Sequence, residues 1–350
     1  MIKGVAIGGD LIGDQRPCFV IAEIGVNFDG DLGRAIESID AAVSSGADAV
    51  KFQTFQADEF VANENLTYTY LLADGRKVTE SQFEMFKRLE LPDEWHSILQ
   101  DRANTKGVTF LSSVADKRAV DLLEDLDVPA FKIASEDLVN VELLSYVAEK
   151  DRPVILSTGM ATLGEIEGAL EILQPLKAKL ILLHCVSVYP TPLEACNLRQ
   201  ISTLRQRFGV PVGFSDHTIG SDAAILAVAL KSCVIEKHFT LDHRLQGPDH
   251  RLSMNPEQFG ALVNKIRQSE MVLGDSTISY SSLEEECRVS YRRGIVAGRD
   301  IEEGEGISWE MLRYKRPQTG LKPYERELIL GKKARTKILK NHAITLADVK

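Results

Sequence analysis

Short apolar runs rich in β-branched and aromatic residues recur along the first 240 residues of the chain. Between them lie segments such as GRAIESIDAAVSSGA (33–47) and SDAAILAVALKS (221–232), with apolar residues at three- and four-residue steps. The runs occupy residues 18–26, 49–54, 108–113, 130–135, 153–159, 180–187, 211–217 and 233–240. This alternation predicts eight strands separated by helices.

Continuously apolar strands that alternate with helices are typical of a parallel sheet covered by helices. Eight such units within about 270 residues fit a closed (β/α)8 barrel, the TIM barrel, in the α/β class. The alternative is a doubly wound open sheet, but no glycine-rich phosphate loop follows the first predicted strand. The pattern therefore favours the barrel.

Two departures from the repeating pattern define the domain organisation. The connection over residues 55–91 is unusually long, and long loops of barrels are usually lids or binding elements. From about residue 288 the pattern changes to short β-like runs with turns. We therefore predict a catalytic barrel domain over 1–273, a linker over 274–290 and a small β-rich domain over 291–350. That domain is too small for a large hydrophobic core of its own, so we expect it to pack against another protein surface.

Composition narrows the class of protein further. The net charge of −10 argues against a nucleic-acid partner. No apolar run is long enough to span a bilayer, and the start MIKGVAIGGD has no signal-peptide pattern, so no membrane association and a cytoplasmic location are expected. The five cysteines form no CxxC motif, and Cys18, Cys185 and Cys233 lie within apolar runs. We expect these three to be reduced core residues.

Polar side chains gather where the predicted strands end, which in a barrel is the rim of the active site. They are Glu23, Asn27, Lys51, Gln53, Ser112, Ser113, Lys132, Ser135, Glu136, Asp137, Ser157, Thr158, His184, Ser187, Tyr189, Ser215, Asp216, His217, Glu236, Lys237 and His238. Buried polar groups without partners cost about 1–3 kcal/mol each, so this set suggests that a ligand supplies partners. Lys51 and Lys132, with several serines, suit an anion that carries both phosphate and carboxylate.

Two histidines end neighbouring predicted strands. His217 closes GFSDH, and His238 lies in VIEKHFT, where strand alternation puts Glu236 on the same face as His238 and Lys237 on the other. Two imidazoles at one rim suit a catalytic divalent metal ion whose remaining positions are open to water and substrate.

Several strings now indicate a family. AEIGVN followed by DG, AVKFQT, FKIAS, ILSTGM, LLHCVSVYPTP, GFSDHTIG, EKHFTLD followed by GPDH, and YKRP resemble, in this order, the sialic acid synthases. The resemblance runs from about residue 16 to the C-terminus. It implies a (β/α)8 barrel joined to a small antifreeze-like domain, called SAF, which in this family reaches into the active site of the other subunit of a homodimer. It also implies condensation of phosphoenolpyruvate with N-acetylmannosamine or a related N-acylated hexosamine, with release of phosphate.

The resemblance assigns roles residue by residue. It makes His217 and His238 ligands of a manganese-type divalent ion, with Mg²⁺ or Co²⁺ as alternatives. Around phosphoenolpyruvate it puts Lys51, Gln53, Ser113, Lys132, Ser135, Ser157, Ser187 and Ser215. It places Glu23, Tyr189 and Asp249 at the sugar and its acyl group. Arg316 would reach the same group from the partner subunit. Lys51 and Lys132 would balance the charge of phosphoenolpyruvate, and Glu23 or Asp137 would orient the attacking water.

Two positions depart from the family pattern. Phe28 follows Asn27 where many members have histidine, which is expected to remove a polar contact near the rim, and Ser187 stands where some members have asparagine. Both bear on which sugar is used: N-acetylmannosamine, its 6-phosphate or a diacetamido-trideoxyhexose. Two other functions are kept as alternatives, a metal-dependent hydrolase on a barrel and a non-catalytic carbohydrate- or ice-binding protein.

Overall fold

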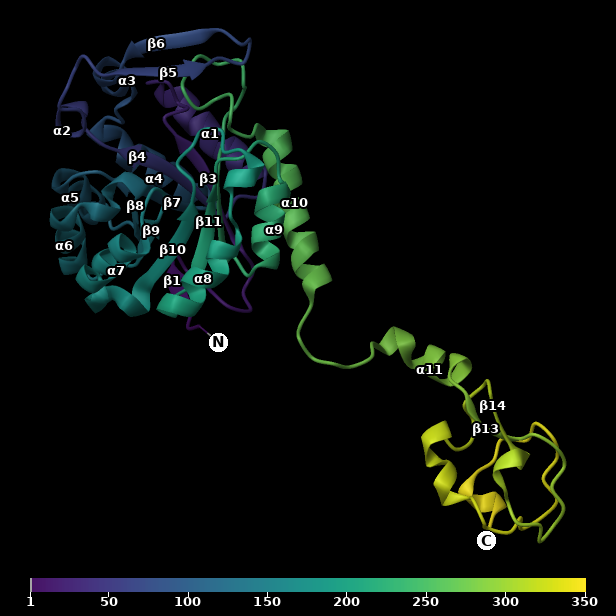
Figure 1. Ribbon diagram of the computed structural model, residues 1–350. Helices are drawn as coiled ribbons and strands as arrows, with labels where there is room; N and C mark the ends of the chain where they lie inside the picture. The colour runs from purple at the N-terminus through teal and green to yellow at the C-terminus, as the bar shows by residue number, and fades with distance from the viewer. Residues whose placement is uncertain (1) are drawn as a thin grey trace. The chain divides into compact units, whose positions relative to one another are not determined.

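The computed structural model describes residues 2–350 and divides into two compact units, one ending at Gly274 and one covering Asp275–Lys350. The first unit holds a closed barrel of eight parallel strands (Figure 1). They are β3 (Phe19–Gly25), β4 (Ala49–Thr54), β7 (Thr109–Val114), β8 (Phe131–Ile133), β9 (Val154–Ser157), β10 (Leu180–Cys185), β11 (Val212–Asp216) and β12 (Val234–His238). β12 pairs with β3 and closes the barrel. The predicted TIM barrel is confirmed.

Helices surround the barrel, and their ends carry the expected capping residues. They are α1 (Leu32–Ser44), α4 (Asp93–Lys106), α5 (Lys117–Asp125), α6 (Val141–Glu149), α7 (Leu163–Ile172), α8 (Arg199–Phe208), α9 (Asp222–Ala229) and α10 (Pro256–Leu273). Asp31 accepts a hydrogen bond from the backbone N–H of Arg34 at the start of α1. Gly107, with a φ of 74°, ends α4 in the left-handed conformation that favours glycine.

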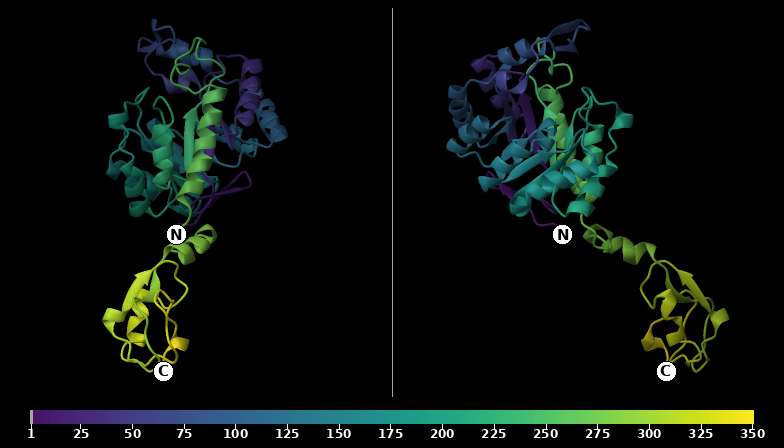
Figure 2. Two further views of the ribbon diagram at one scale, coloured as in Figure 1. Left: turned by 90° about the vertical axis from the view of Figure 1, so that its right-hand side faces the viewer. Right: turned by 60° about the vertical axis from the view of Figure 1, so that its left-hand side comes forward.

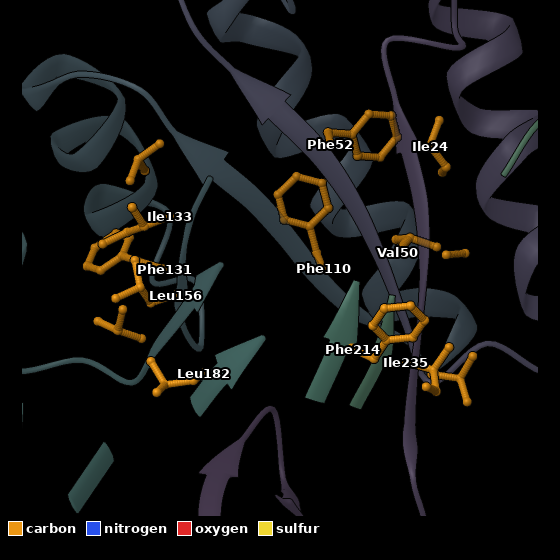
Figure 3. Close-up of a cluster of buried hydrophobic side chains, with 14 of the residues drawn as sticks. Ile24, Val50, Phe52, Phe110, Phe131, Ile133, Leu156, Leu182, Phe214 and Ile235 are labelled. Carbon is orange, nitrogen blue, oxygen red and sulfur yellow. The ribbon is translucent and has the colours of Figure 1, made fainter. Parts of the chain in front are cut away.

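The main core lies between the strands and the helices that cover them. Outward-facing side chains of the strands form this layer, including Phe52, Phe110 and Phe214 (Figure 3). Phe52 and Phe110 are stacked, with ring centroids 5.9 Å apart. Because these side chains point outward, their neighbours along each strand point into the barrel. This alternation positions the polar side chains of the site.

A short N-terminal hairpin, which the sequence pattern did not predict, packs at the end of the barrel where the strands begin. Its strands are β1 (Val5–Ile7) and β2 (Asp10–Ile12), paired antiparallel. Val5, Ile7 and Ile12 form a second cluster with inward-facing residues such as Phe19 and Ile21. The hairpin therefore helps to fill the barrel interior at the amino ends of the strands.

The long connection after β4 is an ordered insertion. It contains α2 (Ala57–Phe60), the antiparallel hairpin of β5 (Thr67–Leu71) and β6 (Lys77–Ser81), and α3 (Gln82–Leu89). Within it Phe55 and Phe60 are stacked and Phe86 meets both edge-on, with ring centroids 5.0–5.6 Å apart. Figure 2 shows the insertion, in dark blue, at the end of the barrel opposite the purple N-terminal hairpin. The insertion thus lies at the rim where the strands end.

The second unit is small and β-rich, as the sequence predicted. After a 3-10 turn at Ser282–Glu284 it has α11 (Glu285–Tyr291), β13 (Gly294–Ala297) and β14 (Leu312–Lys315), which pair antiparallel. Short 3-10 turns follow at Trp309–Met311, Pro323–Leu328 and Leu346–Asp348. Its core is a single cluster that includes Ile295, Ile307 and Ile344.

Three further 3-10 segments belong to the barrel unit: Ser135–Val139, Gln174–Lys179 and Leu193–Ala195. The first of these directly follows β8 and carries part of the site described below. Among residues 2–350, every helix is too short or too polar to cross a membrane.

Candidate functional site

A pocket opens at the carboxyl ends of the barrel strands, and all eight strands or the segments directly after them contribute to its walls. It encloses about 610 Å³, including the part open to solvent. The lining residues are Glu23, Lys51, Gln53, Thr54, Phe55, Phe60, Ser113, Val114, Ala115, Lys132, Ala134, Ser135, Glu136, Asp137, Ser157, Cys185, Tyr189, Ser215, His217, Glu236 and His238. The pocket is therefore where a TIM barrel carries its active site.

Most of the side chains to which the sequence analysis assigned a role meet in this pocket. Those that line it are Glu23, Lys51, Gln53, Ser113, Lys132, Ser135, Asp137, Ser157, Tyr189, Ser215, His217 and His238. Ser187 is not in the lining, but its hydroxyl and that of Ser135, which is, flank Gly159. A Cβ at position 159 would come within 2.7 Å of Ser135 Oγ and closer still to Ser187 Oγ, so glycine lets both hydroxyls approach the backbone.

Two of the predicted residues lie elsewhere. Asp249 is on the segment after β12, with its Oδ2 3.7 Å from Nδ1 of His238, so it borders the pocket. Arg316 is an exposed residue of the second unit, where its guanidinium lies 5.6 Å from the ring centroid of Tyr291. The structure therefore brings Asp249 to the site, while the predicted role of Arg316 stays a prediction.

Lys51 is the centre of a buried charge cluster. Its Nζ lies 2.6 Å from Oε2 of Glu23 and 3.7 Å from Oε2 of Glu236. Gln53 donates a hydrogen bond of 2.9 Å to Oε1 of Glu23. Burial by itself raises the pKa of Glu23 and lowers that of Lys51, but the carboxylates of Glu23 and Glu236 raise the pKa of Lys51 above its ordinary value. Lys51 is therefore charged and already paired.

Lys132 is in a different position. It donates hydrogen bonds of 2.7 Å to Ser157 Oγ and 3.1 Å to the carbonyl oxygen of Ile133. In the described part of the chain no carboxylate oxygen lies within 4.0 Å of its Nζ, and burial lowers its pKa. A buried ammonium with only neutral partners is costly unless an anion binds beside it. Lys132 is therefore the cation of the pocket most available to an anionic ligand.

Glu236 also lines the pocket. The sequence analysis placed it at the rim but assigned it no role. Ser215 Oγ donates a hydrogen bond of 2.8 Å to its Oε1. Although burial alone would raise the pKa of Glu236, Lys132, Lys51 and Ser215 lower it below the ordinary value. Its alternation with His238 along β12 was the signal that could have selected it.

His217 and His238 face one another across the ends of β11 and β12, with ring centroids 5.3 Å apart. Nδ1 of His217 lies 3.0 Å from the carbonyl oxygen of Val186 and donates to it, so in the neutral ring the lone pair is on Nε2. Nδ1 of His238 is buried without a hydrogen-bond partner. Burial, followed by the positive charges of His217 and Lys51, holds the pKa of His238 well below its ordinary value, so its imidazole is neutral.

These two rings fit a divalent ion. Neutral imidazoles with free nitrogens are metal ligands, and bonds of about 2.1 Å let rings at this separation share one ion. Across residues 2–350 no three His, Cys, Asp or Glu side chains form a metal-binding group. An ion bound by two imidazoles alone has open positions for water or substrate, as catalytic metal sites do.

Asp137 follows β8 in the segment Ser135–Val139 and lines the pocket opposite the histidines' strands. Burial raises its pKa from 3.8 to about 6, although Asn140 donates a hydrogen bond of 3.2 Å to its Oδ1. A carboxyl group with such a pKa exchanges protons near neutral pH and is suited to general acid–base work.

Two expectations about individual residues need correction. Cys185 was expected to be a core residue, but it lines the pocket, and its Sγ lies 3.8 Å from Nδ1 of His217. Phe28 was expected near the rim, but it is fully buried between the barrel and the helices, with its ring 6.2 Å from Phe52 and 6.4 Å from Trp95. Phe28 therefore contributes to the core and not to a ligand contact.

A second hollow of about 600 Å³, including its open part, shares Tyr189 with the pocket. Strand β5 contributes Tyr68, Thr69, Tyr70 and Leu71 to its walls. The other lining residues are Pro190, Ile219, Pro248, Arg251 and Leu252. The hydroxyl of Tyr70 donates to Glu80, so the ring of Tyr70 is held in place beside that of Tyr68. The hollow is thus mainly aromatic and aliphatic, with one guanidinium.

Comparisons with known proteins identify relatives over most of the chain. Residues 38–278 match the model of the NeuB family, and residues 292–350 match that of the SAF domain. N,N'-diacetyllegionaminic acid synthase of Legionella pneumophila is 44% identical over 91% of this chain and 91% of its own length. N-acetylneuraminate-9-phosphate synthase of Homo sapiens is 35% identical over 93% of this chain and 90% of its own.

A solved structure is similar as well. The crystal structure of N-acetylneuraminic acid (sialic acid) synthetase from Leptospira borgpetersenii, in complex with citrate, has a TM-score of 0.75 and 34% identity. The match covers 82% of this chain and 95% of that one. Both the resemblance seen in the sequence and the predicted SAF domain are confirmed, and the chain belongs to the NeuB family.

Proposed function

We propose that this protein is a nonulosonic acid synthase that condenses phosphoenolpyruvate with an N-acylated hexosamine in the presence of a divalent metal ion. In the reaction, the vinyl carbon of phosphoenolpyruvate bonds to the aldehyde carbon of the open-chain sugar. Water adds to the cationic carbon that this leaves, and the phosphate departs as inorganic phosphate. The relatives that are synthases of legionaminic acid and of N-acetylneuraminate 9-phosphate support this class of reaction.

The observation that carries the proposal is the combination of Lys132 and the pair His217 and His238 in one pocket. Lys132 is a buried cation with only neutral partners, which suits the phosphate or carboxylate of phosphoenolpyruvate. The two imidazoles suit an ion that, when bound, polarises the aldehyde oxygen of the sugar as a Lewis acid.

The charge balance of the pocket favours such an ion. Its lining contains the carboxyl groups of Glu23, Glu136, Asp137 and Glu236, but only two lysines. An anion with both a phosphate and a carboxylate would add further negative charge to this low-dielectric space. A divalent cation between the histidines would offset part of this negative charge. Mn²⁺ is our first choice, with Mg²⁺ and Co²⁺ as alternatives.

The protein's own residues would guide the water and the substrates. Glu23 is fixed by Lys51 and Gln53, and Asp137 has the pKa of a group that can accept a proton from water near neutral pH. Either can orient the water that adds to the carbon chain. Lys51 and Lys132 would stabilise the negative charges of phosphoenolpyruvate.

The sugar would extend from the histidines past Tyr189 toward the second hollow. Tyr189 lies 4.2 Å from His217 by ring centroids and lines both spaces. Because the hollow offers tyrosine rings, prolines and aliphatic side chains, we favour a sugar whose far end carries neutral groups, a diacetamido-trideoxyhexose, over a 6-phosphate. We also retain the expectation that Arg316 of the partner subunit contacts the acyl group in a homodimer.

The test is a coupled assay of inorganic phosphate with the three candidate sugars. Phosphate release should require phosphoenolpyruvate, sugar and Mn²⁺ together, and mass spectrometry should detect a nine-carbon acid. A metal-dependent hydrolase would instead release phosphate without sugar. Absence of any sugar-dependent phosphate release with all three sugars would contradict the proposal.

A further inference from the structure

Behind the two histidines lies a second pair of charged side chains that touches no part of the pocket. Asp216 ends β11 and Lys237 is the penultimate residue of β12, and the two are directly opposite in the parallel register. Nζ of Lys237 lies 2.9 Å from Oδ2 of Asp216, and the side chains are 1% and 0% exposed. Neither residue lines the pocket, because strand alternation directs them toward the surrounding helices.

The pair is joined to the backbone on both sides of His217. Oδ1 of Asp216 accepts a hydrogen bond of 2.8 Å from the N–H of Thr218, and Lys237 also donates to the carbonyl oxygen of Thr218. The residues before and after His217 are thereby tied to Lys237, whose next neighbour in the chain is His238. The carbonyl oxygens of the two histidines are fixed as well, by the N–H groups of Thr191 and Met254.

A fully buried ion pair contributes little net stability compared with apolar residues of the same volume. Its value here is geometric, since it connects the ends of two strands at the residues that precede the two imidazoles. We propose that Asp216 and Lys237 are positioning residues that hold His217 and His238 in the arrangement needed to bind one divalent ion. This inference rests on the metal site of the proposed function and extends it to residues that contact neither metal nor substrate.

The test measures Mn²⁺ affinity, not turnover. Electron paramagnetic resonance reports free Mn²⁺ in titrations of the full-length chain, with no substrate present. Lys237→Met and Asp216→Asn should each weaken Mn²⁺ binding by about 10- to 100-fold, the usual effect of removing a group that orients a metal ligand. The double variant Asp216→Leu, Lys237→Met removes both charges, so it should regain stability relative to Lys237→Met while its Mn²⁺ affinity stays low.

Arg205→Met is the matched control. Arg205 forms an ion pair of 2.7 Å with Asp14, and both side chains are largely buried, but neither residue lines the pocket. This variant should lower the melting temperature and leave Mn²⁺ affinity unchanged. Such a result would show that destabilisation alone does not weaken metal binding.

The outcomes separate the two proposals. A wild-type chain that binds no Mn²⁺ overturns the proposed metal site and this inference with it. If the wild type binds Mn²⁺ and the Asp216 and Lys237 variants bind it equally well, the metal site stands and the positioning role is wrong. Should Lys237→Met fail to fold, Asp216→Asn, which is isosteric and can still accept from Thr218, decides the question alone.

Discussion

Nζ of Lys51 lies 2.6 Å from Oε2 of Glu23, with side-chain exposures of 5% and 2%, whereas Lys132 in the same pocket has no carboxylate partner within the described residues. The two lysines are therefore not equivalent. Lys51 stabilises the buried carboxylate of Glu23, so its removal leaves Glu23 without its paired cation. Lys132 has only Ser157 and a carbonyl oxygen as partners, so its charge is available to a ligand.

This difference predicts distinct effects of the two lysine-to-methionine substitutions. Lys132→Met should weaken phosphoenolpyruvate binding by roughly 10- to 100-fold, because a charged hydrogen bond is worth about 1.5–3 kcal/mol, and should change the melting temperature less than Lys51→Met does. Lys51→Met should also destabilise the protein by about 3–5 kcal/mol, because one partner of a buried ion pair is lost. Calorimetry with phosphoenolpyruvate and thermal melting measure the two effects. Unchanged affinity in Lys132→Met would show that the anion binds elsewhere.

Metal dependence is the second prediction. A chelator should abolish condensation, and Mn²⁺ should restore it, because the imidazoles of His217 and His238 are the proposed ligands. His217→Ala and His238→Ala should each lose most activity and retain the fold, since both lie at the rim of the barrel. His243→Ala is the control, because His243 bonds Gln258 and does not line the pocket. Full activity in a preparation verified to be metal-free would contradict the proposal.

The barrel could be predicted because its cause is local. Each strand reads as a continuous apolar run, and each predicted run overlaps a strand of the structure. The rim could be predicted because strand ends share one side of a closed parallel barrel, which brings Lys51, Lys132 and His217 into one pocket although they are far apart in the chain.

Other features of the fold and the site depend on tertiary contacts that the hydrophobic pattern of the sequence does not encode. The position of Phe28 is set by the turn after β3, which directs its ring toward Phe52 and Trp95. Cys185 is apolar by composition and faces the pocket only because Leu183 and Cys185 share the inner face of β10. The N-terminal hairpin, with strands of three residues, is too short to leave a periodic signal.

Asp137 predicts a specific pH dependence. Because burial raises its pKa from 3.8 to about 6, the folded state binds this proton more tightly than the unfolded state does. Its contribution to the free energy of unfolding is therefore greatest at low pH and falls as the pH rises toward about 6. Its carboxylate, the form that accepts a proton from water, forms as the pH rises through about 6. The rate should therefore rise through this pH and level off about one pH unit above it.

Asp137→Asn tests this assignment. The variant should lose about 10²- to 10⁴-fold in kcat and should lack the rise near pH 6. The pH–rate profiles must be measured at saturating Mn²⁺. Otherwise protonation of the histidines at low pH could weaken metal binding and produce a similar rise of the rate with pH. A variant that keeps the wild-type profile would assign the water-orienting role to Glu23 instead.

The second hollow predicts the preferred sugar. With tyrosine rings and a single guanidinium as its walls, it should favour a diacetamido-trideoxyhexose over N-acetylmannosamine 6-phosphate in kcat/KM. Tyr70→Ala should raise the KM for the sugar and leave that for phosphoenolpyruvate unchanged, and Arg251→Ala should have little effect on the neutral sugar. If the 6-phosphate is preferred and Arg251→Ala removes that preference, the hollow is a phosphate site and the assignment of the sugar is wrong.

The last prediction concerns Arg316, which the family resemblance places over the sugar of the other subunit. A guanidinium has a planar fork of donors that suits an acyl carbonyl, so Arg316→Ala should raise the KM for the sugar and reduce turnover. Glu23→Gln should be inactive for a separate reason, because it removes a carboxylate of the pocket. Each of these proteins alone should show little activity.

Mixing the two variants distinguishes a shared site from an independent one. In a mixed dimer one pocket combines an intact Glu23 with an intact Arg316 of the partner subunit, and the other pocket has both defects. At equal mixing about half of the dimers are mixed and each has one good pocket, so activity should return to about a quarter of the wild-type value. Subunit exchange must be verified independently, for example with one variant carrying a mass tag. Exchange without any return of activity would show that Arg316 acts within its own subunit or takes no part in the reaction.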